Sequence, residues 1–222
     1  MYDVIKSTMP FLLEGLWVTF QISMITIFCG SLLGAIIGML RTLDSRLVTY
    51  PLGLYIHTLR GTPFLIHLYF VYFMLPSTGV SWLQLEAYAA AVVALSLYTS
   101  TYVAEIIRGA IEAVPPGQNE AARATGMTRL EAMWYVVLPQ AVKMMIPPMG
   151  GIYVMIIKGT SIVSVIGIAE LVRAGEHATQ RHPRELMLIY GMTALLYFVY
   201  CYPVLRLARW AETKFGSVRL PS

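Results

Sequence analysis

The chain has 222 residues, of which 57% are hydrophobic and 13% are charged, and its formal net charge is +4. Soluble domains carry about 25% charged residues, so this composition excludes an ordinary soluble domain and is typical of an integral membrane protein. With so modest a charge, we expect the lipid bilayer rather than a nucleic acid to be a partner.

A helix needs about 20 apolar residues to cross the hydrocarbon core of a bilayer. The chain contains five candidate spans, at approximately 16–40, 62–76, 87–107, 141–157 and 186–207. The first apolar run is too long for a cleaved signal peptide, so we expect it to remain as an anchor. No internal repeat or soluble linker domain separates the spans. The sequence therefore predicts one all-α integral membrane domain over residues 1–222.

The first span contains Gly30, Gly34 and Gly38, four residues apart on one face. Small residues at this spacing let another helix approach closely, so we predict a packing face here.

The second span follows Arg60-Gly61-Thr62-Pro63. Thr62 can cap a helix and Pro63 can fill its first position, which predicts a helix start at or just inside the cytoplasmic interface. Arg60 can extend to the headgroups, and we prefer that interpretation to a gating role.

Lysine and arginine predict the orientation. With the N-terminus outside, nine basic residues fall in inward connections and four in outward ones. The inward residues are Arg41, Arg46, Arg108, Arg123, Arg129, Arg206, Arg209, Lys214 and Arg219, and the outward residues are Lys6, Arg173, Arg181 and Arg184. The positive-inside rule favours this arrangement. It also places the C-terminus in the cytoplasm.

The third span carries a hydroxyl patch that includes Ser100, with Glu105 just over one turn further on. A carboxylate within a span is expensive and usually faces a cavity or a partner. One interpretation pairs Glu105 with Arg108 at i,i+3 spacing, and the other makes Glu105 a ligand for substrate.

The fourth span contains Lys158-Gly159-Thr160-Ser161. We expect Gly159 to break that helix. Irregular backbone at membrane depth is tolerated only where it is buried within protein or lines a cavity.

A charged, alanine-rich stretch at 117–139 interrupts the apolar chain. Pro115 and Pro116 should end the third helix, and Asn119 can then cap a short helix with Glu120 in its first turn. Gly126 stands where a left-handed residue is wanted. Thr128 follows and begins a capping box with the glutamate three residues later. The stretch predicts a helix, a glycine corner and a second helix at the cytoplasmic face, although composition alone would favour a solvated interfacial loop.

Several motifs resemble one family in order and spacing. Glu120-Ala121-Ala122, then Gly126, then Leu138-Pro139 resemble the EAA loop of ABC importer permeases. The runs RGTP, YVAEIIRGAI, LPQA and KGTS followed by SVIGIAEL resemble the polar amino-acid uptake branch, over nearly the whole chain. The resemblance implies a five-span permease of the bacterial inner membrane. Its loop would form a coupling helix that docks on a cytoplasmic ATPase.

The resemblance also implies partners and a ligand site. A second permease subunit, itself or a similar chain, would pair with this one, and a periplasmic solute-binding protein would deliver substrate. Similarity to the family favours Glu105 as a contact for a bound amino acid, with Ser100, Thr160 and Ser161 as further candidates and Lys158 as a structural partner. The family usually has an aspartate where this chain has Gly159. The chain would then have one anion fewer for an ammonium group, which argues against a strongly cationic substrate.

The chain contains no G-x-x-x-x-G-K-[ST] phosphate loop, so we expect ATP-Mg on a partner and no cofactor on this chain. The four histidines show no metal spacing. Two alternatives remain: a non-transporting scaffold that docks a cytoplasmic partner through 117–141, and a secondary transporter, which would need an internal inverted repeat. A membrane enzyme is disfavoured because the sequence offers no nucleophile–base or metal set.

Overall fold

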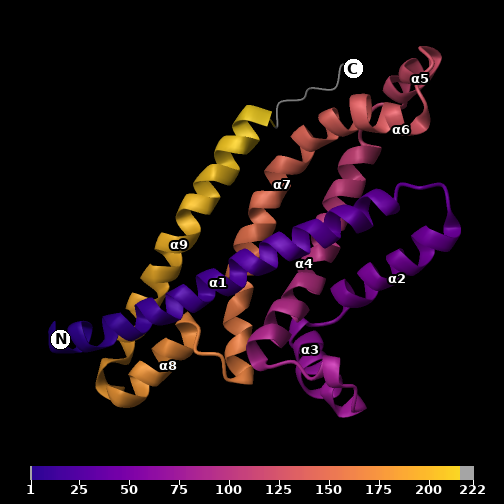
Figure 1. Ribbon diagram of the computed structural model, residues 1–222. Helices are drawn as coiled ribbons and strands as arrows, with labels where there is room; N and C mark the ends of the chain where they lie inside the picture. Colours follow the sequence, from indigo (N-terminus) through magenta and orange to yellow (C-terminus); the bar gives the residue numbers. More distant parts are fainter. Residues whose placement is uncertain (1, 216–222) are drawn as a thin grey trace.

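The computed structural model describes residues 2–215, which form helices and no strand (Figure 1). The α-helices are α1 (Tyr2–Leu40), α2 (Arg46–Gly61), α3 (Phe64–Tyr69), α4 (Ala87–Glu112), α5 (Pro116–Ala124), α6 (Arg129–Ala132), α7 (Leu138–Gly159), α8 (Leu171–Arg181) and α9 (Leu186–Phe215). Two π-helical stretches, η1 (Phe70–Met74) and η4 (Met133–Val137), and a 3-10 stretch, η5 (Thr160–Ile166), join or extend them. The all-α fold class is confirmed.

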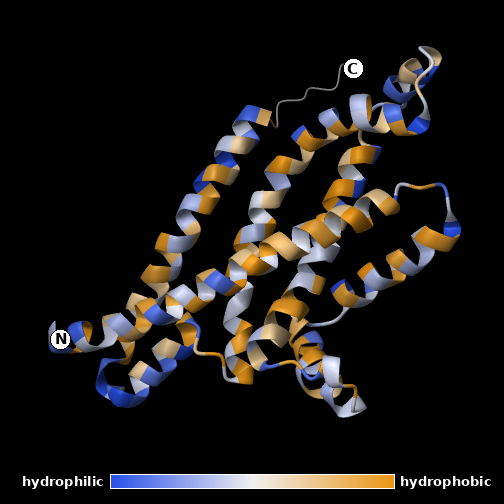
Figure 2. Cartoon of the chain, in the orientation of Figure 1, coloured by the Kyte–Doolittle hydropathy of each residue, from blue (hydrophilic) through white to orange (hydrophobic). Residues whose placement is uncertain are grey.

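Four helical stretches are long and apolar enough to cross a membrane: Tyr2–Leu40, Ala87–Glu112, Arg129–Ile166 and Pro183–Phe215. A shorter apolar stretch covers Phe64–Thr78. Each long stretch extends beyond the span expected at its place in the sequence, because turns that carry polar and charged residues continue the helix past its apolar core. Hydrophobic residues dominate the middle of the bundle, whereas hydrophilic residues gather at α8 and around α5 and α6 (Figure 2).

Helices α1 and α4 pack closely through the predicted glycine face, which is confirmed. A Cβ atom added at Gly34 would lie 2.6 Å from Val103 Cβ, and one at Gly30 would lie 2.6 Å from Thr99 Cβ. Both distances are shorter than carbon atoms tolerate, so only glycine permits this approach. The close approach brings Arg41, just beyond the end of α1, alongside α4.

A buried carboxylate fixes the helix α8 to the bundle. Glu170 is fully buried and accepts hydrogen bonds from the backbone N–H groups of Val172 at 3.0 Å and Arg173 at 2.9 Å. The hydroxyl of Tyr197 on α9 donates a third, at 3.0 Å. Burial raises the pKa of the Glu170 carboxyl, and the N–H donors act in the opposite direction. Glu170 therefore serves as the N-cap of α8 and as its tie to α9.

Candidate functional site: the coupling loop and the face of α4

The stretch 115–139 forms two short helices that project from one end of the bundle (Figure 1). Helix α5 begins at Pro116, with Pro115 rather than Asn119 at its N-cap. The expected cap is wrong because proline fixes its own φ in the helical range and needs no N–H partner in the first turn. Ala122 is the buried residue of α5, and Glu120 and Ala121 are exposed.

Gly126 forms the corner between the two helices. Its φ is +91°, in the left-handed region that the sequence predicted, and a Cβ atom there would meet nothing within 4 Å. Thr128 then begins α6 with the predicted capping box: its hydroxyl accepts the Glu131 N–H at 3.2 Å, and its own N–H donates to the Glu131 carboxylate at 2.7 Å. Both predictions are confirmed, and backbone sterics with local hydrogen bonds account for the shape.

Two contacts hold this loop against the body of the protein. Arg129 pairs with Asp44, in the turn between α1 and α2, at 3.1 Å, and Gln140 donates to the side-chain oxygen of Gln118 at 3.3 Å. Beneath the loop lies a groove of about 870 Å³, lined by residues of α4, α5, α6 and the α1–α2 turn. The loop is thus anchored at its edges while its outer surface stays open.

The π-helical stretch η4 leads from α6 into α7. The N–H of Leu138 bonds to the carbonyl of Met133, five residues back, and Pro139 follows at the start of α7. A proline clashes with the carbonyl four residues before it, so the helix widens by one residue to accommodate the ring. Leu138 and Pro139 therefore mark the joint between the loop and the long helix α7.

Glu105 lies in an ion-pair network in the half of α4 that leads toward α5. Its carboxylate pairs with the guanidinium groups of Arg41 and Arg108, the latter at 2.9 Å, and Arg108 also pairs with Glu112 at 2.5 Å. The i,i+3 pair with Arg108 is confirmed. Arg41 is an additional partner, 64 residues away in the chain, which no local spacing could have indicated.

The other ligand candidates do not converge on Glu105. The hydroxyl of Ser100 is fully buried, lies 2.8 Å from the Tyr55 hydroxyl and donates to the Leu97 carbonyl. Thr160 is also fully buried and donates to the Ile157 carbonyl at 2.7 Å. Ser100 is therefore bonded to its own helix and to Tyr55 on α2, and Thr160 to the end of α7, so the two do not form one shared site with Glu105.

The expected break at Gly159 does not occur. Gly159 has φ −62° and ψ −21°, and the chain continues from α7 directly into the 3-10 stretch η5. The helix persists because the 3-10 hydrogen-bond pattern keeps its backbone groups paired. Lys158 pairs with no carboxylate in the part of the chain that the structure describes, and it lines a cavity of about 440 Å³ with Ser161, Tyr197 and Cys201. The expected pairing of Lys158 with Glu105 is therefore not observed.

The irregular segment lies instead at Gly61–Pro63. Helix α2 ends at Gly61, Thr62 is extended at φ −124° and ψ 150°, and Pro63 is the N-cap of α3. The Thr62 hydroxyl donates back to the Thr58 carbonyl at 2.8 Å, so Thr62 ends α2 rather than capping α3. The ring of Phe64 packs 5.3 Å from that of Tyr98, near the middle of α4. The segment therefore lies beside the middle of α4, and its predicted position at the cytoplasmic interface stays a prediction.

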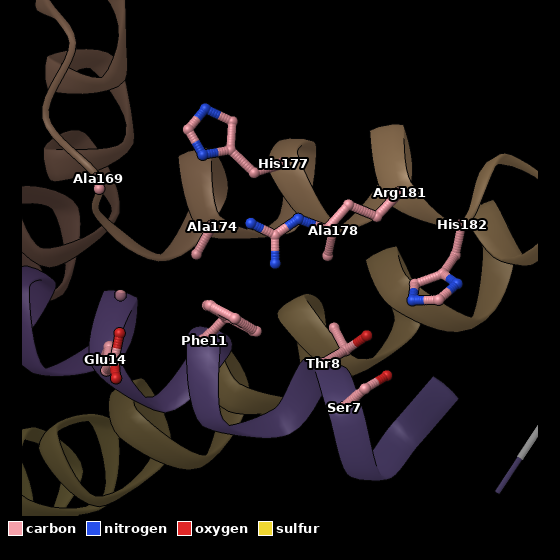
Figure 3. Close-up of a pocket in the computed structure, with 11 residues that line it drawn as sticks. Ser7, Thr8, Phe11, Glu14, Ala169, Ala174, His177, Ala178, Arg181 and His182 are labelled. Atoms are coloured by element: carbon pink, nitrogen blue, oxygen red, sulfur yellow. The ribbon is translucent and has the colours of Figure 1, made fainter. Parts of the chain in front are cut away.

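A small pocket of about 150 Å³ lies between α1 and α8 (Figure 3), at the end of the molecule away from α5 and α6 (Figure 1). Glu14, His177 and His182 line it, and the Arg181 guanidinium lies 4.7 Å from the centre of the Phe11 ring. Within residues 2–215, no group of three or more acidic, histidine or cysteine side chains could hold a metal ion.

Comparison with known proteins identifies the family. The family described as binding-protein-dependent transport system inner membrane component matches residues 30–216. The L-cystine transport system permease protein TcyB of Bacillus subtilis (strain 168) is 33% identical over 202 residues, covering 90% of this chain and 85% of that protein. The glutamine transport system permease protein GlnP of Escherichia coli (strain K12) is 34% identical over 198 residues, covering 89% of this chain and 90% of that protein.

Solved structures agree with these relatives. A crystal structure of an amino acid ABC transporter with histidines matches at a TM-score of 0.86 and 36% identity, covering 96% of this chain and 97% of that chain. An inward-facing MetNI methionine ABC transporter matches in fold alone, at a TM-score of 0.72 and 20% identity. The chain belongs to the family of binding-protein-dependent transport system inner membrane components and is a permease subunit of an ABC importer, in which a separate subunit hydrolyses ATP.

Proposed function

We propose that this chain forms half of the translocation path of an importer for a polar amino acid. The relatives named for L-cystine and glutamine support this substrate class. The observation that carries the proposal is the exposed pair α5–α6 with its left-handed Gly126, because a small, rigid projection of this kind fits a cleft on an ATPase subunit.

The proposed function implies four kinds of partner. A second permease subunit, either a copy of this chain or a similar one, completes the path, because the helices of one subunit are too few to enclose a solute. Two ATPase subunits dock below the loops, and a solute-binding protein docks at the end that carries α8. The exposed aromatic side chains of α1 and α9, Trp17, Phe28 and Phe198 among them, suit lipid or the second subunit.

Transport follows from a shift between two conformations. ATP binding closes the two ATPase subunits, the coupling loops move together, and the outward-facing state becomes favoured. Arg129 and Gln118 tie the loop to the α1–α2 turn and to α7, so the loop moves with the helices rather than independently of them.

The orientation is part of the proposal: the N-terminus lies outside, the C-terminus lies in the cytoplasm, and the chain crosses the membrane five times. Alkaline phosphatase fused after Thr78 or Gly175 should be active, because these sites face the periplasm. A fusion after Gln118 should be inactive. Activity of the Gln118 fusion would contradict both the orientation and the assignment of α5–α6 to the ATPase.

Reconstitution of the complete importer tests the function. The purified complex in proteoliposomes should take up radiolabelled L-glutamine or L-cystine when ATP is inside, and the loaded solute-binding protein should stimulate ATP hydrolysis. A scaffold would bind its cytoplasmic partner equally well but show neither uptake nor stimulation. That result would favour the alternative function.

A further inference from the structure

The turn between α1 and α2 marks the level of the lipid headgroups. The apolar run of α1 ends at Leu40, and the residues from Arg41 to Arg46 then read RTLDSR. Arginine gathers where a span leaves the hydrocarbon core on the cytoplasmic side, so this turn lies among the headgroups. In the proposed orientation these are the headgroups of the cytoplasmic leaflet, and the inference rests on that orientation.

A groove lies beside this turn, on the first part of α2, at the margin of the bundle (Figure 1). It has a volume of about 690 Å³ and is lined by Arg41, Arg46, Leu47, Thr49, Tyr50 and Pro51. Leu47 is 90% exposed and Tyr50 is 77% exposed, and Leu54 continues the same face of the helix. A row of exposed apolar side chains next to a cation is typical of a surface that meets lipid at the headgroup boundary.

Arg46 supplies a positive charge that no carboxylate within residues 2–215 neutralises. Asp44, two residues before it, pairs instead with Arg129 of the coupling loop at 3.1 Å. Arg41, at the other side of the groove, is already paired with Glu105. The groove therefore carries one free positive charge, and it adjoins the turn that anchors the coupling loop.

The start of α2 adds donors beside that charge. The side chain of Ser45 makes no cap hydrogen bond, and its carbonyl accepts the N–H groups of Val48 at 3.1 Å and Thr49 at 2.9 Å. The first N–H groups of α2, those of Arg46 and Leu47, are left without a side-chain cap. Uncapped N–H groups at a helix start favour an anion, and here they add to the charge of Arg46.

We propose that this groove binds an anionic phospholipid of the cytoplasmic leaflet. The Arg46 guanidinium and the start of α2 hold the phosphate, because a guanidinium can donate to two phosphate oxygens at once. The exposed hydroxyl of Tyr50 donates to the headgroup, and an acyl chain lies along Leu47 and Leu54. A free phosphate ion would satisfy Arg46 but leave the apolar row in water, whereas a phospholipid supplies both the negative charge and the apolar chain.

The test titrates the purified permease–ATPase complex in detergent with fluorescent phosphatidylglycerol, and with phosphatidylcholine carrying the same label as the neutral reference. Fluorescence anisotropy gives the two affinities. Arg46→Gln should weaken the binding of phosphatidylglycerol by about fivefold, the effect of one basic residue near an anionic membrane surface, and leave that of phosphatidylcholine unchanged. Arg46→Lys should keep most of the affinity, because an ammonium group also binds phosphate. Leu47→Gln should weaken the binding of both lipids, because it removes apolar contact with the acyl chain.

Arg209→Gln is the matched control. Arg209 is exposed near the end of α9, is predicted on the same side of the membrane, and pairs with no carboxylate in the described part of the chain. It lines none of the grooves and cavities described above. The variant should bind both lipids as the wild type does. If Arg209→Gln weakens phosphatidylglycerol as much as Arg46→Gln does, general surface charge attracts the lipid and the proposal fails.

Other occupants of the groove give results of their own. If inorganic phosphate displaces phosphatidylglycerol and Leu47→Gln binds both lipids normally, the groove is a site for a soluble anion. If Arg46→Gln releases the ATPase or the second permease subunit on size-exclusion chromatography, Arg46 meets a carboxylate of that subunit. Either result overturns the proposal, as does unchanged affinity of Arg46→Gln for phosphatidylglycerol.

The orientation is tested separately by the alkaline phosphatase fusion after Gln118. If that fusion is active, the proposed orientation fails and so does the assignment of the lipid to the cytoplasmic leaflet. The lipid titration reports on the groove itself, so the failure of the groove and the failure of the orientation are distinguishable.

Discussion

The coupling loop and the arginine-rich face of α4 are built in opposite ways. In the loop, the decisive contacts join residues three to five apart in the chain, as in the Thr128–Glu131 capping box and the Thr125 bond to the Ala122 carbonyl. On α4, Arg41 reaches Glu105 across 64 residues. The loop is exposed and the network is half-buried. Local signals therefore shape the loop proposed to dock on the ATPase, and helix packing shapes the polar face of α4.

The comparison predicts that mutations in the two regions fail differently. A change in the loop should leave a folded, inserted protein that is poorly coupled to ATP. A change that separates α1 from α4 should cost stability, because the network depends on that packing.

The largest effect is expected from Gly34→Leu. A Cβ atom at Gly34 would lie 2.6 Å from Val103 Cβ, so any side chain forces α1 away from α4. We expect little folded protein in the membrane, measured by membrane abundance and by fluorescence-detected size-exclusion chromatography. Gly109→Leu is the matched control, because a Cβ atom at Gly109 meets nothing within 4 Å. Equal abundance of the two variants would show that the α1–α4 packing is not what holds the bundle together.

Gly126→Val should come next and should affect transport rather than folding. A left-handed conformation costs an L-residue about 1–2 kcal/mol, and more when the side chain is β-branched. We expect uptake to fall by about five- to thirtyfold at normal membrane abundance, since that energy opposes the corner. Uptake by proteoliposomes and ATP hydrolysis should be measured together.

Gly126→Asn provides the control for this prediction, because asparagine tolerates the left-handed region. It should retain most of the uptake. If the valine and asparagine variants behave alike, the left-handed corner is not required for coupling.

Glu105→Gln should have an intermediate effect, a loss of stability of the folded bundle. Losing the carboxylate leaves Arg41 and Arg108 without their shared counter-charge. We expect a destabilisation of about 1–3 kcal/mol, below the cost of breaking a fully buried pair. Thermal unfolding of the purified protein measures it. If Glu105→Gln weakens substrate binding but leaves thermal stability unchanged, Glu105 is a ligand, as expected from the sequence, rather than the centre of an ion-pair network.

A double variant sharpens that test. Arg41→Gln combined with Glu105→Gln removes both charges and should recover part of the lost stability, because residues in direct contact are not additive. A double variant as unstable as the sum of the single variants would contradict the direct pairing of Arg41 with Glu105.

The smallest effect is expected from Thr128→Ala. Losing an N-cap side chain costs about 0.5–2 kcal/mol, and here the cost falls on α6 alone. Uptake should fall by only a few-fold, and the melting temperature of the bundle should not change. Thr128→Ser keeps the capping oxygen and should behave as the wild type does. A lower melting temperature for Thr128→Ala would show that the loop supports the bundle.

The sequence by itself determined the features that depend on neighbours in the chain. Composition indicated a membrane protein, the motif order indicated the permease family, and spacing predicted the Gly126 corner, the capping box and the glycine face of α1. Backbone sterics and hydrogen bonds over a few residues produce each of these features, so a local pattern suffices. The five-span count stays a prediction.

Only the tertiary structure decided which polar side chains meet. Gly159 was expected to break a helix and does not, whereas the break at Gly61–Pro63 lies beside the middle of α4. Arg41 joins Glu105, and Arg60 lies over Tyr102, through packing that no spacing rule encodes. The depth and partners of a charged side chain follow from where whole helices settle against one another, and that depends on close packing summed over the bundle.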